Sequence, residues 1–120
     1  MPDIVNLLPY LHVADVERSL VFYALLGFEV HARVVDDEGV AWARLHSHGA
    51  GLMVARADAP FDPGAQAVLL YLYAQNLEAT RDRLIAAGLA PGPIEAQAAA
   101  PRRMRLDDPD GYGLLIAAPV

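Results

Sequence analysis

The stretch LHVADVERSLVFYALLGFEV, residues 11–30, carries the signals of a strand followed by a helix. The short apolar run over residues 7–13 predicts the strand. Asp15 stands where a helix N-cap is expected, because its carboxylate can accept hydrogen bonds from the free N–H groups of the first turn. Apolar residues then recur at a helical spacing until Gly27, which supplies a C-terminal stop. The stretch therefore predicts a strand and a helix with defined ends.

Three strand-like runs follow this helix, and the whole pattern then begins again. The first half ends with strands over residues 28–35, 40–46 and 51–56 and a linker with prolines and glycine over residues 57–65. The second half reads as a strand over 68–73, a helix over 77–87 capped by Asn76 and stopped by Gly88, an irregular proline-containing strand, and strands over 104–107 and 113–118 joined by the turn DPDG. Each half thus has the order βαβββ.

The two halves align without a gap when 61 is added to each residue number. The aligned pairs are Tyr10 with Tyr71, Leu11 with Leu72, Asp15 with Asn76, Glu17 with Glu78, Ser19 with Thr80, and Gly27 with Gly88. Because the cap, the helix face and the stop align together, an internal duplication is favoured over a chance likeness of two ordinary strand-helix units.

Length and composition are typical of one small domain. The chain has 120 residues, of which 55% are hydrophobic and 20% charged. No apolar run approaches the roughly eighteen residues that a membrane span needs. The amino terminus lacks the basic start and apolar stretch of a secretory signal. We therefore expect a soluble, cytoplasmic protein that makes no contact with a membrane.

Charge and cysteine usage exclude several classes of function. With no cysteine, the chain has no disulfides, thiolate zinc sites, iron–sulfur clusters or cysteine nucleophile. A net charge of −6 with only nine Lys and Arg residues argues against a nucleic-acid partner. The one basic cluster is Arg102, Arg103 and Arg105, which is interpreted as a solvated strand edge, with anion binding by one of the three as the alternative.

The quoted stretch, followed by LDDPDGYGLLI at residues 106–116, resembles the vicinal oxygen chelate superfamily. This superfamily includes glyoxalase I, extradiol dioxygenases, fosfomycin-modifying transferases and the bleomycin resistance proteins. The resemblance implies a single α+β domain over residues 1–120, with βαβββ modules over about 1–58 and 66–120. It further implies a curved mixed sheet around a cavity, with the helices on the outer face, and a homodimer.

In the enzymes of this superfamily, a divalent metal binds in the cavity to His, Gln or Glu side chains from four strands. By the family spacing, the corresponding residues here are Leu8, Met53, Leu69 and Leu115. Hard and borderline ions need oxygen, nitrogen or thiolate donors, and three leucines and a methionine supply none. We therefore expect neither a metal nor another cofactor.

Three histidines are the alternative ligands for a metal. His46 and His48 are two residues apart at the end of a strand, and His12 could join them. The sequence shows no carboxylate at a fitting spacing for such a site, so surface histidines are the favoured interpretation.

Strand alternation predicts which side chains line the cavity instead. If Leu8 and Leu69 face inward, Tyr10 and His12 follow on the first strand, and Tyr71 and Tyr73 on the strand of the second half. The small residues around Ala43 suit packing under a helix, which leaves Trp42, Arg44 and His46 for the cavity. The predicted ligand-binding set is Tyr10, His12, Trp42, Arg44, Met53, Leu69, Tyr71, Tyr73 and Leu115.

The leading hypothesis is a metal-independent protein that binds a small organic molecule. The resemblance to the bleomycin resistance group, which also lacks the metal ligands, suggests an aromatic or amphipathic compound such as an antibiotic. The alternative is an unconventional lyase, isomerase or dioxygenase-like enzyme of the superfamily, in which His12, the one weak catalytic candidate, acts with Tyr10 or Arg44. In a third hypothesis the tyrosines fill a core or a dimer seam and the partner is a protein.

Overall fold

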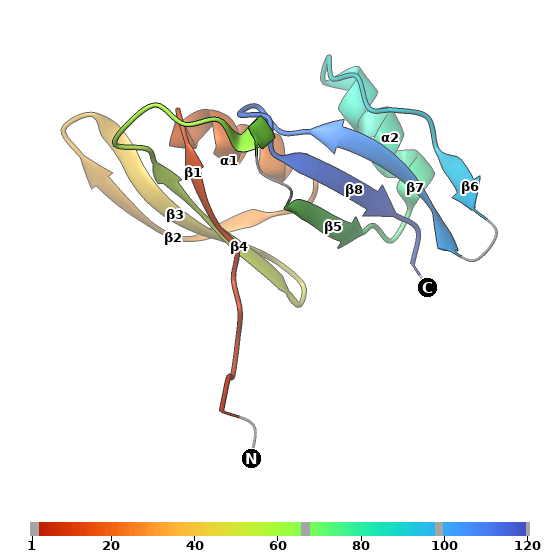
Figure 1. Ribbon diagram of the computed structural model, residues 1–120, viewed down its shortest axis with the longest axis horizontal. Coiled ribbons are helices and arrows are strands. Elements are labelled where there is room, and N and C mark those ends of the chain that lie inside the picture. The colour runs from red at the N-terminus through yellow and green to blue at the C-terminus, as the bar shows by residue number, and fades with distance from the viewer. Residues whose placement is uncertain (1–2, 66–67, 98–99, 120) are drawn as a thin grey trace. The chain divides into compact units, whose positions relative to one another are not determined.

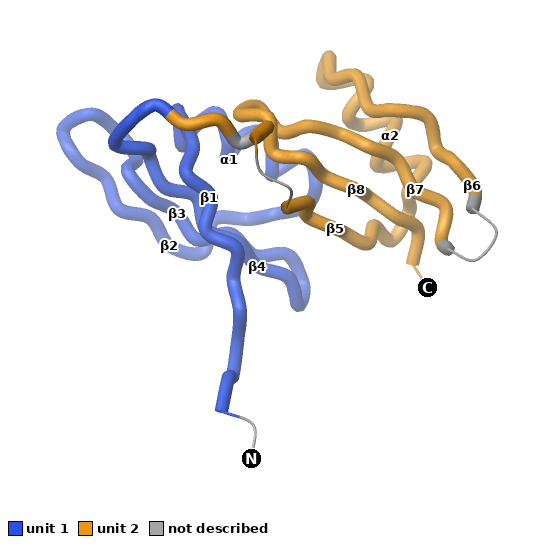
Figure 2. The backbone as a smooth tube through the Cα atoms, in the orientation of Figure 1, with its two compact units in different colours: residues 1–60 blue, residues 61–120 orange. Residues whose placement is uncertain are grey.

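The computed structural model describes residues 3–65, 68–97 and 100–119. The chain divides into two compact units, Met1–Pro60 and Phe61–Val120 (Figure 2). The division falls inside the linker predicted over residues 57–65.

The first unit is one βαβββ module. Its elements are β1 (Tyr10–Val13), α1 (Val16–Ala24), β2 (Glu29–Asp36), β3 (Gly39–Ser47) and β4 (Ala50–Arg56). The four strands form a sheet in the order β1-β4-β3-β2, in which β1 runs parallel to β4 and the other neighbours are antiparallel (Figure 1).

The second unit repeats this topology. Its elements are a short 3-10 helix η1 (Pro63–Ala65), β5 (Leu69–Tyr73), α2 (Leu77–Ala86), β6 (Glu95–Gln97), β7 (Ala100–Asp107) and β8 (Gly113–Ala117). The strand order β5-β8-β7-β6 again pairs the first and last strands in parallel. The predicted α+β fold of two βαβββ modules is confirmed as two four-stranded mixed sheets. Their union into one curved sheet around a cavity stays a prediction.

The predicted caps and stops of the two helices are confirmed. The Asp15 side chain accepts a hydrogen bond from the Arg18 N–H at 3.3 Å, and the Asn76 side chain accepts one from the Ala79 N–H at 3.0 Å. Gly27 and Gly88 follow the helix ends with φ of 93° and 87°, a conformation that glycine adopts without steric cost. Among the described residues, no helix is long and apolar enough to cross a membrane.

Each helix covers one face of its own sheet. In the first unit, Leu11 and Val13 of β1 are buried, whereas Tyr10 and His12 between them are exposed. The Tyr23 side chain of α1 is fully buried, and its ring meets those of Phe22 and Phe28 edge to face, with centroids 5.0 and 6.0 Å apart. The core of the second unit contains Leu77, Leu84, Met104, Leu106, Leu114 and Ile116. The opposite face of each sheet is not covered by its helix.

Three strand boundaries differ from the sequence prediction. The first strand starts at Tyr10 rather than at residue 7, because Pro9 has no N–H to donate, although its carbonyl accepts from the Met53 N–H at 2.8 Å. The strand predicted over 104–107 starts four residues earlier, at Ala100. The irregular strand is reduced to Glu95–Gln97, with a register shift against its neighbour.

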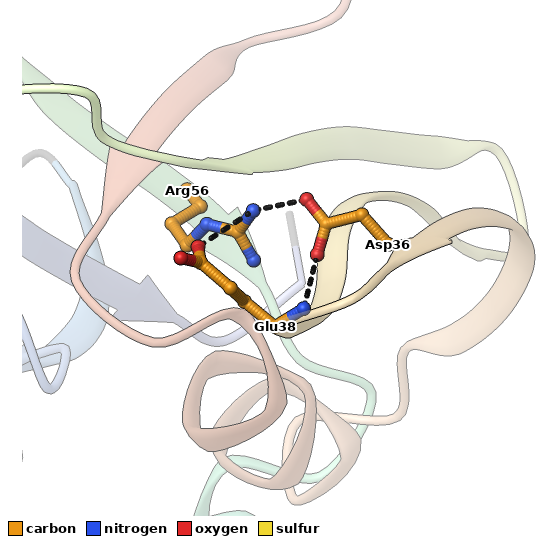
Figure 3. A network of polar contacts seen from close by, with 3 residues as sticks. All are labelled: Asp36, Glu38 and Arg56. Atoms are coloured by element: carbon orange, nitrogen blue, oxygen red, sulfur yellow. Dashed lines mark hydrogen bonds and ion pairs between the residues drawn. The ribbon is translucent and has the colours of Figure 1, made fainter.

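An ion-pair network ties the end of β2 to the end of β4 (Figure 3). The Arg56 guanidinium bonds the Asp36 carboxylate and lies 3.4 Å from that of Glu38, whose own N–H donates to Asp36 at 2.9 Å. Arg56 pairs in the ladder with Val13, which is buried on the helix side, so the network lies on that side. The hydrogen bond from Arg56, with that from the Glu38 N–H, holds the pKa of Asp36 below its ordinary value.

This lowered pKa predicts a pH-dependent contribution to stability. Because the folded-state pKa of Asp36 is depressed, its contribution is present above the unfolded pKa and is lost as the pH falls through the folded value. We expect Asp36→Asn to melt below the wild type at pH 7, and this difference to shrink once the pH is below about 4. Thermal unfolding followed by circular dichroism checks this. The neighbour Asp37→Asn serves as the control, and equal differences at pH 7 and pH 3 would contradict the assignment.

Candidate functional site

The uncovered face of the first sheet carries a row of three predicted site residues. Tyr10 of β1 lies opposite Met53 of β4, which lies opposite Arg44 of β3. Residues paired in a ladder project to the same face of a sheet, so these side chains are neighbours. Tyr10 is 50% exposed, whereas Met53 and Arg44 are half-buried.

A second row on the same face holds the other two site residues of this unit. His12 lies opposite Ala55, and Ala55 lies opposite Trp42. The rings of Tyr10 and His12 meet edge to face with centroids 5.4 Å apart, which joins the two rows. Alternation therefore placed Tyr10, His12, Trp42, Arg44 and Met53 on one face as predicted, and their binding role stays a prediction.

The uncovered face of the second sheet repeats the first row. Tyr71 of β5 lies opposite Leu115 of β8, which lies opposite Arg105 of β7. Tyr73 lies two residues further along β5 and therefore on the same face. The centroids of the Tyr71 and Tyr73 rings are 5.3 Å apart. Tyr71 and Tyr73 are 42% and 59% exposed. This unit thus presents two adjacent aromatic rings beside an arginine.

Arg105 and Arg103 belong to this face, where the sequence analysis did not place them. The interpretation of the basic cluster as a strand edge is wrong, because β7 lies between β8 and β6. The buried Met104 separates the two arginines, which share one face, whereas Arg102 projects the other way and pairs with Glu78 of α2 at 2.9 Å. The alignment of the two halves could have predicted the position of Arg105, because the 61-residue offset pairs it with Arg44.

The four residues that the family spacing aligns with metal ligands, Leu8, Met53, Leu69 and Leu115, lie in these rows or next to them. Leu8 packs against Gly51, where an added Cβ would approach its Cδ2 to 2.7 Å, and Leu69 packs in the same way against Gly113, at 2.5 Å. Met53 and Leu115 are the middle residues of the two rows. Hydrocarbon and thioether groups do not fit a divalent ion of the kinds that these enzymes use. Among the described residues, no group of three or more His, Cys, Asp or Glu side chains could hold a metal.

The candidate histidines have different neighbours from those considered in the sequence. His46 lies against His31 of β2, with ring centroids 5.1 Å apart, and its Nε2 is 4.0 Å from the carboxylate of Glu29. His12 lies elsewhere on the sheet, opposite Ala55. The strand pairing that brings Glu29 to His46 supplies the carboxylate that spacing along the sequence did not show.

A comparison with known protein families identifies the superfamily of the chain. The profile of the Glyoxalase/Bleomycin resistance protein/Dioxygenase superfamily matches residues 4–116. The chain therefore belongs to this superfamily, as the resemblance indicated. No curated protein sequence matches the chain significantly.

Solved structures with this fold include two proteins described as binding an antibiotic. A bleomycin-binding protein complexed with bleomycin is 22% identical and superposes with a TM-score of 0.76, over 98% of this chain and 100% of the other. TnmS3, an antibiotic binding protein from a Streptomyces species, is 24% identical with a TM-score of 0.76, and both chains are covered completely. A glyoxalase/bleomycin resistance protein from Streptomyces is 25% identical with a TM-score of 0.71, over 92% of this chain and 96% of the other.

The side chains at the metal positions predict that divalent ions do not stabilise this protein. A ligand that binds the folded state raises the melting temperature by mass action, and an ion without donors cannot do so. We expect stoichiometric zinc, nickel or manganese to leave the melting temperature unchanged, as measured by differential scanning fluorimetry with EDTA as the control. A rise of several degrees that EDTA reverses would contradict this expectation.

Proposed function

We propose that this protein binds and sequesters a small aromatic or amphipathic molecule, such as an antibiotic, without a metal and without catalysis. The observation that carries the proposal is the composition of the two uncovered sheet faces. Each has a tyrosine, an apolar residue and an arginine in one row, and the apolar residue stands at a position where the superfamily's enzymes hold a metal ligand.

The physical argument rests on exposed aromatic area. Tyrosine and tryptophan offer large rigid surfaces with a polar tip and few rotatable bonds, so contact with a flat ligand costs little side-chain entropy. Tyr10, Tyr71 and Tyr73 keep between 42% and 59% of their surface in water. A planar organic molecule stacked on Tyr10, or one stacked on Tyr71 and Tyr73, would remove that surface from solvent, which is favourable at roughly 25 cal/mol per Å² of apolar area.

The descriptions of two similar solved structures support a binding function. Two structurally similar proteins of nearly the same length are described as binding bleomycin or another antibiotic. The similarity in fold supports a binding role for this chain, and its exposed tyrosines supply a contact surface.

A homodimer in the cytoplasm, with both modules acting as one domain, is part of the same proposal. The segment before β1 exposes Ile4, Val5 and Leu7 by 80%, 98% and 80%. Such a concentration of exposed aliphatic surface favours association with a second copy of the chain. A sequestering protein also acts where the target of an antibiotic lies, which favours the cytoplasm.

Association through this segment can be tested by charge insertion. We expect the wild type to sediment as a dimer at micromolar concentration, and Val5→Asp with Leu7→Asp to shift it toward the monomer, since two carboxylates would be desolvated at the contact. Analytical ultracentrifugation measures both. A wild type that stays monomeric up to 100 micromolar would exclude the dimer.

Ligand binding can be followed through Trp42, the only tryptophan in the chain. We expect saturable quenching of its fluorescence, with a rise in melting temperature, for at least one member of a panel of aromatic antibiotics that includes bleomycin. Tyr10→Ala, on the same sheet face of the first unit as Trp42, should weaken binding by about tenfold, because a stacked aromatic contact contributes on the order of 1 kcal/mol beyond its area.

Ile85→Ala on the surface of α2 is the matched control, since it removes an exposed apolar side chain from the helix side. Its affinity should equal that of the wild type. If no member of the panel changes either the fluorescence or the melting temperature, the proposal loses its basis.

A further inference from the structure

The first unit contains a polar pocket of about 250 Å³ at the turn between β3 and β4. His31 of β2, Arg44 and His46 of β3, and His48 of the turn line it, together with Asn6 from the segment before β1. It belongs to one unit only, and Arg44 is also the last residue of the row that begins at Tyr10. The pocket therefore continues the uncovered face of the first sheet.

The charge of this pocket is opposite to that of the protein. The chain has a net charge of −6, yet among the described residues that line the pocket there is no aspartate or glutamate. The nearby carboxylate of Glu29 lies 4.0 Å from His46 and is 82% exposed, outside the lining. The pocket thus concentrates one guanidinium and three imidazoles.

Arg44 is available for a ligand. Arg56, Arg102 and Arg105 each pair with a carboxylate of the protein. The Arg44 side chain, by contrast, forms no ion pair or hydrogen bond with any residue that the structure describes, although it is half-buried. A partly desolvated guanidinium gains most from a bidentate contact with an oxyanion.

The backbone at His48 is unusual for its residue type. Ser47 pairs with Ala50, so His48 and Gly49 form the whole turn, and His48 adopts φ of +52°. Such a conformation is uncommon for a residue with a side chain, and strained positions concentrate at binding sites. Here it places an imidazole at the pocket, where glycine would be the less strained residue.

We propose that this pocket binds the oxyanion of an organic acid, a carboxylate, sulfonate or phosphate, whose apolar body lies on the adjoining sheet face. The Arg44 guanidinium supplies two parallel N–H donors to the oxyanion, and the imidazoles supply N–H donors to its remaining oxygens. This inference rests on the proposed function, because the apolar body needs the row of Tyr10 and Met53. It narrows the ligand class from aromatic molecules in general to acidic ones.

Two probes of nearly the same shape, naphthalene-2-sulfonate and the neutral naphthalene-2-sulfonamide, separate the contribution of the acidic group to the affinity from that of the apolar body. Isothermal titration calorimetry at pH 7 and low salt measures both on the full chain. We expect the sulfonate to bind about tenfold tighter or more, because a charge-assisted bidentate contact exceeds a neutral one by that order. Raising the sodium chloride concentration should reduce only the sulfonate's advantage.

Three variants assign this preference to the pocket. Arg44→Gln should bring the ratio of the two affinities close to one, and Arg44→Lys should leave an intermediate ratio, since the charge remains and the fork is lost. His48→Gly should lower the ratio while the melting temperature stays equal or rises, because glycine relieves the positive φ. Arg33→Gln, which removes a charge from β2 opposite the buried Ala43, should leave the ratio unchanged.

The outcomes distinguish the two proposals. If both probes bind equally and Arg44→Gln changes nothing, the anion site is excluded while the small-molecule function stands. If inorganic sulfate binds as tightly as the sulfonate, the pocket binds anions but the adjoining sheet face adds no affinity, which contradicts the inference that an organic acid is the ligand. If neither probe binds to a folded protein, both the anion site and the aromatic face are contradicted.

Discussion

The burial of one face of each sheet beneath a single helix is the constraint on which the rest of the structure depends. Strand residues alternate between the two faces, so a strand that supplies Leu11 and Val13 to the core must direct Tyr10 and His12 away from it. A shift of one residue in the register would exchange the two sets and place the rings of Tyr10 and His12 beneath α1. The caps at Asp15 and Asn76 support this arrangement by fixing where each helix begins.

Duplication turns this constraint into a repeated surface. The same offset that aligns the helix signals relates Tyr10 to Tyr71 and Arg44 to Arg105. The two faces then differ in detail, since the first adds Trp42 and a pocket with histidines, and the second adds a pair of tyrosine rings.

Much of this could be predicted from the sequence, because the deciding signals are local. Caps, stops and the period of two are properties of neighbouring residues, so the elements and the facing of Trp42 and Tyr71 followed from them. The contacts that were missed are cross-strand contacts. The pairing of Glu29 with His46 and the interior place of β7 depend on strand order and register, which no single segment encodes. Pro9 shortens the first strand because proline has no backbone N–H to donate. This signal is local, but the apolar pattern over residues 7–13 predicted a longer strand.

The leucine side chains at Leu8 and Leu69 lie where Gly51 and Gly113 leave room for them, with less than 3 Å between each leucine and an added Cβ. In each unit, the size of the leucine side chain is therefore coupled to the absence of a side chain at the glycine. A histidine substituted for either leucine to create a metal centre would occupy a space shaped for a branched aliphatic chain. The glycine opposite would offer no side chain to orient the imidazole. A metal centre at these positions would therefore require a change in the shape of the sheet as well as new donor atoms, by paired substitutions at each leucine and the glycine opposite it.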